Sequence, residues 1–209
     1  MLKVENIDVW GFEHAIRGMR NPMNSWDKSD SYFRSETSWG IGKNDLDLMK
    51  RLYKAGTEHR TYARMIQVSM DITAPLYWWK EMDRYTVGKS QVSCSTMHKI
   101  AAKEFELDDF SHEHLIETVS NTTNTVMVLK NLIECLNYYR SQFIFTKDKK
   151  YWWQLIQLLP SSYNQRRTVC MSYEIVFKII KERTGHKLDE WNDFVEILKD
   201  LPYVKEIME

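Results

Sequence analysis

A regular alternation of apolar and polar side chains marks residues 65–73 as a β-strand. One face of this strand must be buried, and the other is polar and accessible. Pro75 follows directly, and proline suits the first turn of a helix because the backbone N–H that it lacks has no partner there. The sequence therefore predicts a strand that leads into a helix ending near residue 85. The apolar face consists of Ile66, Val68, Met70 and Ile72.

The rest of the chain is mainly helical in pattern. Residues 2–10 alternate well enough for a first strand, and residues 11–19 have helical spacing. Residues 44–55 predict a short helix, with Asn44 as its N-cap and Gly56 at its end. Further helical patterns cover residues 114–143, 149–159, 166–183 and 188–201. The sequence therefore predicts an α/β or α+β protein, dominated by helices, with a small sheet.

Two polar segments are expected to be loops. Residues 20–42 are turn-rich and weakly periodic, and a long loop in a compact domain is usually functional or mobile. Residues 87–99 combine small hydroxyl side chains, a cysteine and several cations. Such a loop suits a phosphate, because hydroxyls, backbone N–H groups and ammonium groups all donate to its oxygens. A polar surface loop without any ligand explains the same composition.

Composition narrows the classes of function. The 209 residues are enough for one domain with a real core, and 29 basic residues balance 29 acidic ones. This balance argues against a nucleic-acid polymer as partner. Cys94, Cys135 and Cys170 form no CxxC pair, so we expect a reducing, cytoplasmic location. No apolar run reaches the roughly 18 residues of a membrane span, and the N-terminus lacks the apolar segment of a signal peptide.

Patterns for metal and nucleophile chemistry are weak. His112 and His114 form a close pair that no other ligand cluster joins, so we expect no metal site. Gly40 and Gly42 lack the spacing of a phosphate-binding glycine loop, and no serine lies in a nucleophile elbow. Cys94 is a weak candidate for a catalytic nucleophile, since the cationic side chains near it in sequence favour a thiolate.

Aromatic residues and arginines each have two interpretations. Eight tryptophans and eleven tyrosines are many for this length, and most such clusters build a core or a subunit interface. Stacking on a planar ligand is the alternative. Arg167 and Arg183 would lie fairly near the same side of one continuous helix, where their planar guanidinium groups suit phosphate. Arginines near helix ends also pair with the helix dipole or with nearby acids.

The order of several features resembles that of the flavin-dependent thymidylate synthases. Glu58 and His59 precede the strand, Ala74 and Pro75 open the next helix, and Arg84 stands at its end. The resemblance covers nearly the whole chain. Three longer segments resemble the family's first helix, its leucine-rich helix before Glu-His, and its late Arg…His…Trp segment: residues 11–19, 48–59 and 183–191.

The family's signature, Arg-His-Arg followed by seven residues and a serine, is degenerate here. The triplet reads Arg84-Tyr85-Thr86, and Cys94 stands where the family has serine. The phosphate-gripping Gly-Arg-Tyr that follows becomes residues 95–97, Ser-Thr-Met. Each lost cation removes charge-assisted hydrogen bonds of about 1.5–3 kcal/mol. Residues that would restore part of this charge are Lys89, His98 and Lys99.

Further departures concern the flavin site. The Asn-x-Arg that helps to hold the flavin in the family resembles Gln165-Arg166-Arg167, and a neighbouring asparagine is replaced by Ser172. Arg183 and His186 match the family's late arginine and histidine, with an offset of about one residue.

The resemblance implies a thymidylate synthase-complementing-like fold: a single helix-dominated α+β domain over residues 1–209 with a small, mainly antiparallel sheet. It also implies a homotetramer that binds FAD at subunit junctions, with a pyrimidine nucleotide against the isoalloxazine ring. In the family, reduced flavin mediates carbon transfer from methylenetetrahydrofolate to dUMP, and NADPH is the usual reductant. The cofactor-binding residues implied are Glu58, His59, Arg84, Arg167, Ser172 and His186. The substrate-binding residues implied are Ser90, Gln91, Ser93, Ser95, Thr96 and Arg183.

Two other classes of function stay open. The degenerate signature also suits a non-catalytic protein that retains the fold and binds a nucleotide or assembles with itself. A nucleic-acid-binding protein that uses its aromatics and arginines is the weaker possibility, because the net charge is zero.

Overall fold

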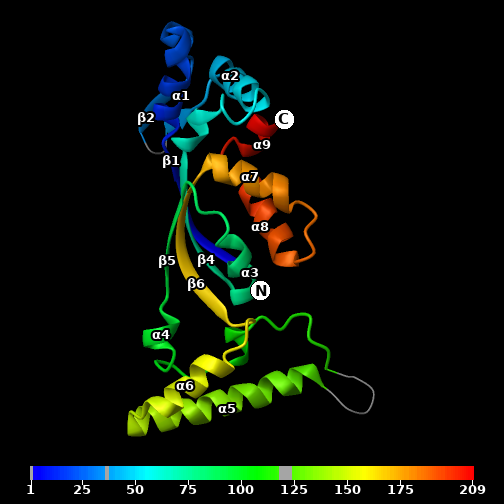
Figure 1. The fold of residues 1–209 in the computed structure, drawn as a ribbon. Coiled ribbons are helices and arrows are strands. Elements are labelled where there is room, and N and C mark those ends of the chain that lie inside the picture. Colours follow the sequence, from blue (N-terminus) through cyan, green and yellow to red (C-terminus); the bar gives the residue numbers. More distant parts are fainter. Residues whose placement is uncertain (1, 36–37, 118–123) are drawn as a thin grey trace. The chain divides into compact units, whose positions relative to one another are not determined.

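The computed structural model describes residues 2–35, 38–117 and 124–209 (Figure 1). The chain divides into two compact units. Unit 1 comprises residues 1–3, 72–84 and 92–167. Unit 2 comprises residues 4–71, 85–91 and 168–209.

A small antiparallel sheet has four strands in the order β1-β4-β6-β5, and each of them contributes residues to both units. Its strands are β1 (Lys3–Trp10), β4 (Gln67–Pro75), β5 (Lys89–Ser93) and β6 (Asn164–Ser172). Burial alternates along β4 as the sequence predicts, with Val68, Met70 and Ile72 buried and the residues between them partly exposed. The predicted strand is therefore confirmed.

Apart from the strand residues that belong to unit 1 and an isolated bridge between Phe110 and Tyr163, the regular structure of this unit is helical. Pro75, predicted in the first turn of the helix, is instead the last residue of β4 and the N-cap of the first helix of unit 1. The helices are α3 (Leu76–Met82), α4 (Thr96–Lys99), η4 (Leu107–Asp109), α5 (Thr125–Thr146) and α6 (Lys149–Leu158).

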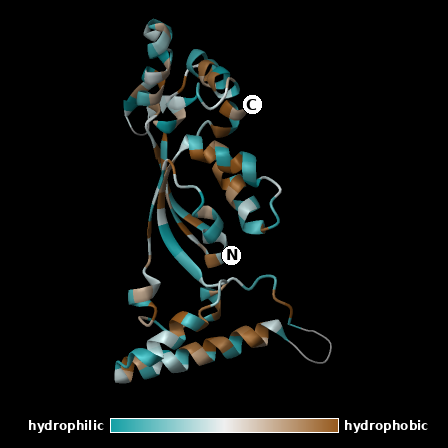
Figure 2. Ribbon diagram, viewed as in Figure 1, coloured by the Kyte–Doolittle hydropathy of each residue, from teal (hydrophilic) through white to brown (hydrophobic). Residues whose placement is uncertain are grey.

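The longest helix of unit 1, α5, begins where the Asn124 side chain accepts a hydrogen bond from the Met127 N–H, at 3.0 Å. It ends at Thr146, and its C-cap Lys147 has a positive φ of 57°. Helix α5 packs along α6, and Figure 2 shows hydrophobic residues over most of its length. The core that the two helices share with the segment before them contains Ile100, Phe105, Phe110, Leu129, Ile133, Leu136 and Leu155.

Unit 2 holds the remaining helices and a β-hairpin. Helix α1 and helix α7 both pack against η3, α7 also packs against α8, and α2 packs against α9. The helices are α1 (Phe12–Arg20), η1 (Asn21–Met23), η2 (Trp26–Lys28), α2 (Lys43–Lys54), η3 (Thr61–Arg64), α7 (Tyr173–Arg183), α8 (Asp189–Lys199) and α9 (Val204–Met208). The hairpin strands are β2 (Tyr32–Ser35) and β3 (Ser38–Gly40), which pair antiparallel.

A buried ion pair joins α1 to α2. Arg20 Nε lies 2.6 Å from Asp45 Oδ1, and both side chains are almost fully buried. Asp45 Oδ2 also accepts hydrogen bonds from both the hydroxyl and the N–H of Ser31, and from the Ser29 hydroxyl. One carboxylate therefore fixes two helices and the segment between them.

The expectation of a loop over residues 20–42 is wrong for most of that segment, because it forms two 3₁₀ turns and the β2–β3 hairpin. Phe33 and Trp39 stack across the hairpin, and Trp39 stacks on Phe12 of α1. Residues 36–37 of this call lie outside the described residues. Contacts between aromatic rings and the hydrogen bonds to Asp45 hold the described part of this segment in place. The weak periodicity of the sequence does not reveal these contacts.

The helix predicted over residues 166–183 is also wrong. Its first part belongs to strand β6, and helix α7 begins only at Tyr173. Val169 and Met171 are buried at strand spacing, and the segment pairs with β4 and β5. Arg167 and Arg183 therefore do not share a continuous helix.

Three smaller boundaries also differ from the expectations. Residues 89–93 form strand β5 and residues 96–99 form α4, where a loop was expected. The helix predicted from residue 114 begins at Thr125, and residues 118–123 of that call lie outside the described residues. Gly42, rather than Asn44, is the N-cap of α2.

Candidate functional site: a basic hollow in unit 2

A hollow of about 800 Å³ opens in unit 2 between the end of α2, the turn η3, strand β5 and helix α7. Five basic and two acidic side chains line it, so it favours an anionic ligand. We call it the first hollow. Its lining residues are Tyr53, Thr57, Arg60, Arg64, Gln67, Val87, Gly88, Lys89, Ser90, Cys170, Ser172, Glu174, Ile175, Phe177, Lys178, Lys181 and Glu182.

Arg60 is the most constrained cation of the first hollow. Its Nε and Nη2 atoms donate to the two carboxylate oxygens of Glu174 at 2.8 and 3.1 Å. Its guanidinium carbon lies 5.1 Å from the ring centroid of Tyr53. Two parallel hydrogen bonds and a ring contact fix this arginine, and Glu174 offsets its charge.

The other cations of the first hollow differ in how far nearby acids compensate their charges. Lys178 Nζ lies 4.0 Å from Glu182 Oε1, at the limit of an ion pair and with both side chains about half exposed. No acidic side chain of the described residues pairs with Arg64 or Lys181, which are both exposed. These two side chains carry the least compensated positive charge in the first hollow.

Backbone and hydroxyl groups form another part of the wall. Gly88 has a positive φ of 80°, and its carbonyl oxygen accepts a hydrogen bond from the Ser172 N–H at 3.0 Å. A Cβ atom at position 88 would lie 3.1 Å from the Ser172 hydroxyl oxygen. Glycine therefore allows this segment to approach the start of α7. Ser90 and Ser172 add hydroxyl donors to the lining.

Cys170 is the thiol of the first hollow. Burial raises the pKa of this thiol, and its Sγ lies 3.8 Å from the Gln67 Oε1. The neutral thiol is therefore the favoured form, and Cys170 is a poor nucleophile.

Arg183 is buried beside Tyr85 rather than in the first hollow. Its Nε donates to the Tyr85 hydroxyl oxygen at 3.0 Å, and its Nη1 lies 3.1 Å from His186 Nε2. The guanidinium carbon is 4.5 Å from the ring centroid of Trp191. Tyr85 in turn donates to Glu182 at 2.9 Å, and burial raises the pKa of its phenol. Two residues assigned from the sequence, Arg183 and His186, therefore contact each other.

A second group of assigned residues meets in unit 1. The Cys94 N–H donates to the Arg166 carbonyl, and the Cys94 carbonyl accepts from Gln165 Nε2. Arg167 donates to Gln165 Oε1 and pairs with Asp83 at 2.7 Å. Cys94 itself is exposed.

Trp79 supports the arginine of this group. The Arg167 guanidinium carbon lies 4.2 Å from the Trp79 ring centroid, and Trp79 is buried. The indole N–H donates to the Gln165 carbonyl at 2.9 Å. A fixed, partly buried cation on an aromatic ring is the result.

The remaining assigned residues have simpler surroundings. Glu58, His59 and Arg84 are exposed, and none of them lines the first hollow. Ser95 caps α4, since its hydroxyl accepts from the His98 N–H at 3.1 Å. Gln91 accepts from Lys89 Nζ at 3.1 Å. Ser93 is exposed at the end of β5, and Thr96 is the first residue of α4.

Sequence reasoning missed most cations of the first hollow. Lys178 and Lys181 lie one turn apart on α7, whereas Arg60 precedes the turn η3 and Arg64 is the last residue of that turn. No motif marks these residues. Their spacing of three or four is the signal that could have been found, because such residues share one side of a turn.

The described residues contain neither a candidate metal site nor a candidate membrane span. Within residues 2–35, 38–117 and 124–209, no group of three or more His, Cys, Asp or Glu side chains is placed to hold a metal ion. The His112 Nδ1 lies 2.8 Å from the Phe110 carbonyl oxygen. No helix of the described part is long and apolar enough to cross a membrane.

Solved structures of similar fold are known. A thymidylate synthase X (ThyX) from Helicobacter pylori, solved with FAD and dUMP, is 17% identical and aligns over 100% of this chain and 97% of its own, with a TM-score of 0.71. A second structure, the flavin-dependent thymidylate synthase ThyX from Helicobacter pylori complexed with FAD and dUMP, is also 17% identical. It aligns over 99% of this chain and 97% of its own, with a TM-score of 0.68. No protein-family model and no curated protein matches the chain.

This likeness establishes the fold. The predicted α+β fold, helix-dominated with a small antiparallel sheet and like that of the flavin-dependent thymidylate synthases, is confirmed.

Proposed function

We propose that the chain is a divergent flavin-dependent thymidylate synthase-like enzyme. It transfers a one-carbon unit from methylenetetrahydrofolate to a pyrimidine nucleotide similar to dUMP, with FAD as cofactor and NADPH as reductant. The observation that carries the proposal is the agreement of the fold over both whole chains, 100% of this one and 97% of a protein solved with FAD and dUMP. A shared fold over this length supports the proposal, because a binding site depends on the framework that the fold provides.

The residues of the first hollow fit a phosphate-bearing cofactor or substrate. Arg64 and Lys181 supply positive charge that no described acid compensates, and Ser90 and Ser172 supply hydroxyl donors. Charge-assisted hydrogen bonds of this kind are the strong ones in proteins. The glycine at position 88 keeps that part of the wall free of a side chain.

Each group of residues has a proposed role. When FAD is bound, it supplies the redox chemistry, and the protein positions the reactants and excludes water. Arg167, fixed by Trp79 and Asp83, presents a rigid cation. Arg183 and His186 position each other by direct contact. We retain the sequence-based assignment of the cofactor-binding residues: Glu58, His59, Arg84, Arg167, Ser172 and His186. The substrate-binding residues are Ser90, Gln91, Ser93, Ser95, Thr96 and Arg183.

The proposal also includes a homotetramer and a cytoplasmic location, as the family resemblance implies. Cys94 is retained only as a weak candidate for a nucleophile. It is exposed, and its backbone, rather than its sulfur, makes the hydrogen bonds described above.

A non-catalytic nucleotide-binding protein is the second proposal, and one observation favours it. Arg183 and Tyr85, which stand at positions matched to the family's functional residues, bond to each other in the interior. A side chain held in this way is less available to a nucleotide phosphate. In this case the fold would bind nucleotide or assemble with itself without flavin chemistry.

The deciding experiment is the flavin content of the purified full-length chain, measured from its visible absorbance before and after incubation with FAD. We expect FAD uptake, and turnover of dUMP with methylenetetrahydrofolate and NADPH. A colourless protein that takes up no added FAD would overturn the enzyme proposal. In that case, thermal stabilisation by dUMP, dTMP or dCMP without FAD would favour the non-catalytic protein.

A further inference from the structure

A second basic hollow lies in unit 2, formed by α1, η2 and α2. Its volume is about 600 Å³, and five basic side chains and one acidic side chain line it. We call it the α2 hollow. Its lining residues are Arg20, Lys28, Asn44, Asp47, Lys50, Arg51 and Lys54. None of them belongs to the first hollow or to the sites implied by the family resemblance.

The cations of the α2 hollow are concentrated on one helix face. Asp47, Lys50, Arg51 and Lys54 stand at positions i, i+3, i+4 and i+7 of α2, so they lie on the same side. Lys50 and Lys54 are a like-charge pair at i, i+4, which destabilises a helix. In a chain whose total charge is zero, this local excess of positive charge is unfavourable until an anion compensates it.

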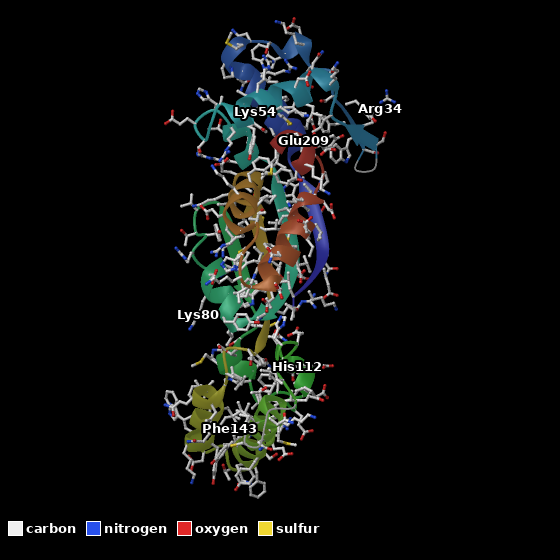
Figure 3. The ribbon with its side chains drawn as sticks, turned by 90° about the vertical axis from the view of Figure 1, so that its right-hand side faces the viewer. Arg34, Lys54, Lys80, His112, Phe143 and Glu209 are labelled. Atoms are coloured by element: carbon white, nitrogen blue, oxygen red, sulfur yellow. The ribbon has the colours of Figure 1, made fainter. Side chains whose placement is uncertain are left out.

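The protein's own acids compensate this charge weakly. Glu209 Oε2 lies 3.9 Å from Lys50 Nζ, but the glutamate side chain is 73% exposed, and exposed pairs of this kind contribute little. Figure 3 labels Lys54 on α2 and Glu209 at the end of α9, the helix that packs against α2. Asp45 compensates Arg20, and Asp47 is the one acid of the lining, so the excess positive charge of the α2 hollow comes from Lys28, Lys50, Arg51 and Lys54.

Arg20 forms a rigid, buried part of the wall of the α2 hollow. Its side chain is 4% exposed, and its Nε and Nη1 atoms donate to Asp45 and to the Ser25 carbonyl. Its second terminal nitrogen, Nη2, has no hydrogen-bond partner among the described residues. Buried hydrogen bonds thus fix the Arg20 side chain, and its Nη2 can still donate a hydrogen bond to a ligand.

The lining indicates the chemistry of the ligand. No aromatic ring lines the α2 hollow in the part of the chain that the structure describes, so a nucleobase would find nothing to stack on. Three of the cations are lysines, whose ammonium groups are point charges on flexible stems and require no planar partner. A flexible chain that carries several carboxylates suits this lining better than a nucleic acid does.

The two hollows share the last turn of α2. Tyr53 lines the first hollow, and the next residue, Lys54, lines the α2 hollow. Successive residues of a helix differ by about 100° in direction, so the two hollows occupy adjacent faces of α2. A ligand with its reactive end in the first hollow could extend an anionic tail around this helix.

We propose that the α2 hollow binds the oligo-γ-glutamate tail of the folate co-substrate. The inference rests on the proposed function, which supplies the folate. It assigns Lys50, Arg51 and Lys54 to the carboxylates of the tail and sets a preference for folates with several glutamates over those with one.

The direct test measures binding of a free penta-γ-glutamate peptide to the full-length chain by calorimetry at low and high salt. We expect binding that weakens with salt, and at least a tenfold weaker affinity in the double variant Lys50→Ala, Lys54→Ala. The control variant, Lys103→Ala with Lys149→Ala, changes two lysines of unit 1 and should bind like the parent. No binding by the parent protein, or equal loss in both variants, would overturn the inference.

A second measurement separates this inference from the proposed function. With pentaglutamyl methylenetetrahydrofolate, the double variant should show a raised KM and an unchanged kcat, while the monoglutamyl form shows little change. Turnover that treats both forms alike would reject the tail site and leave the enzyme standing. A protein without turnover that still binds the peptide through Lys50 and Lys54 would reject the enzyme and the folate tail, and would keep the α2 hollow as a site for a chain of carboxylates. Tighter binding of a single-stranded RNA of equal charge would overturn the assignment to a glutamate tail.

Discussion

Arg60 and Glu174 form a two-point ion pair, with nitrogen–oxygen distances of 2.8 and 3.1 Å, between residues 114 positions apart in the chain. Both side chains are largely buried, at 16% and 14% exposed. The pair attaches the turn before β4 to the first turn of α7, and these two segments form much of the first hollow. Arg60 is thus held by Glu174, which offsets its charge, whereas Arg64 and Lys181 pair with no described acid.

Arg60→Ala should lower the free energy of unfolding by about 2 kcal/mol, because both charge-assisted hydrogen bonds are lost and Glu174 stays largely buried without its partner. Urea denaturation measures this. Arg64→Ala is the matched control, since Arg64 is exposed and pairs with no described acid, and it should change stability by less than about 0.5 kcal/mol. Equal losses in the two variants would contradict the assignment of Arg60.

The sequence predicts β4 but not β6, for a physical reason. In β4 the alternation is clear, and Pro75 marks the change to helix. In β6 the buried Val169 and Met171 lead without a glycine or proline into the buried face of α7. Strand spacing and helix spacing therefore merge into one apolar pattern. Pairing with neighbouring strands decides the outcome, and pairing is not visible in a local window.

The candidate site shows the same limit. Ser90 and Ser172 were found through the family resemblance, and both line the first hollow. Arg60 and Lys181 come from segments far apart in the chain and belong to no motif. Their shared position depends on how α7 packs against η3. Only the tertiary structure reveals such a cluster.

Tyr85→Phe tests whether Arg183 is held by the interior of unit 2. The Tyr85 hydroxyl accepts from Arg183 Nε at 3.0 Å and donates to Glu182 at 2.9 Å. Its removal should cost about 1–3 kcal/mol of unfolding free energy, because a buried guanidinium loses a partner. Chemical denaturation with and without dUMP provides the measurement. If stability without nucleotide is unchanged, Tyr85 does not anchor Arg183.

Asp45 predicts a specific pH dependence. Burial alone raises the pKa of its carboxyl, but hydrogen bonds from Ser31 and Ser29 and the Arg20 pair outweigh burial and lower it. The folded pKa therefore lies below the unfolded value of about 3.9. The stabilisation is fully present above the unfolded pKa and is lost as pH falls through the folded pKa.

Asp45→Asn should cost about 3–5 kcal/mol at neutral pH, since Arg20 would keep its buried charge without a counter-ion. The variant should also lose part of the decline in stability below about pH 4 that the parent protein shows. Asp47→Asn, an exposed position on the same helix, is the control and should behave like the parent. If stability falls with decreasing pH in the same way in the parent and in Asp45→Asn, the Asp45 carboxylate is not responsible for the loss of stability in acid.

The thiols should react in a definite order with a disulfide reagent. Cys94 is exposed and should react first, whereas burial raises the pKa of Cys170 and leaves less thiolate at any pH below it. In a Cys94→Ser, Cys135→Ser background, the labelling rate of Cys170 should rise only at a higher pH than that of a free cysteine. Labelling at the pH of an unperturbed thiol would contradict the burial of Cys170.

Gly11 and Gly56 both have a positive φ, of 95° and 110°, but differ in their surroundings. A Cβ atom at Gly11 would lie 2.2 Å from the Met65 carbonyl oxygen, while one at Gly56 would meet no atom within 4 Å. Gly56→Ala should therefore cost only the backbone strain of a left-handed residue, about 1–2 kcal/mol. Gly11→Ala should cost clearly more, because α1 must move away from the segment before β4. Thermal denaturation of the two variants measures their losses of stability. If Gly11→Ala loses no more stability than Gly56→Ala, the close approach of Gly11 to Met65 is not required for the fold.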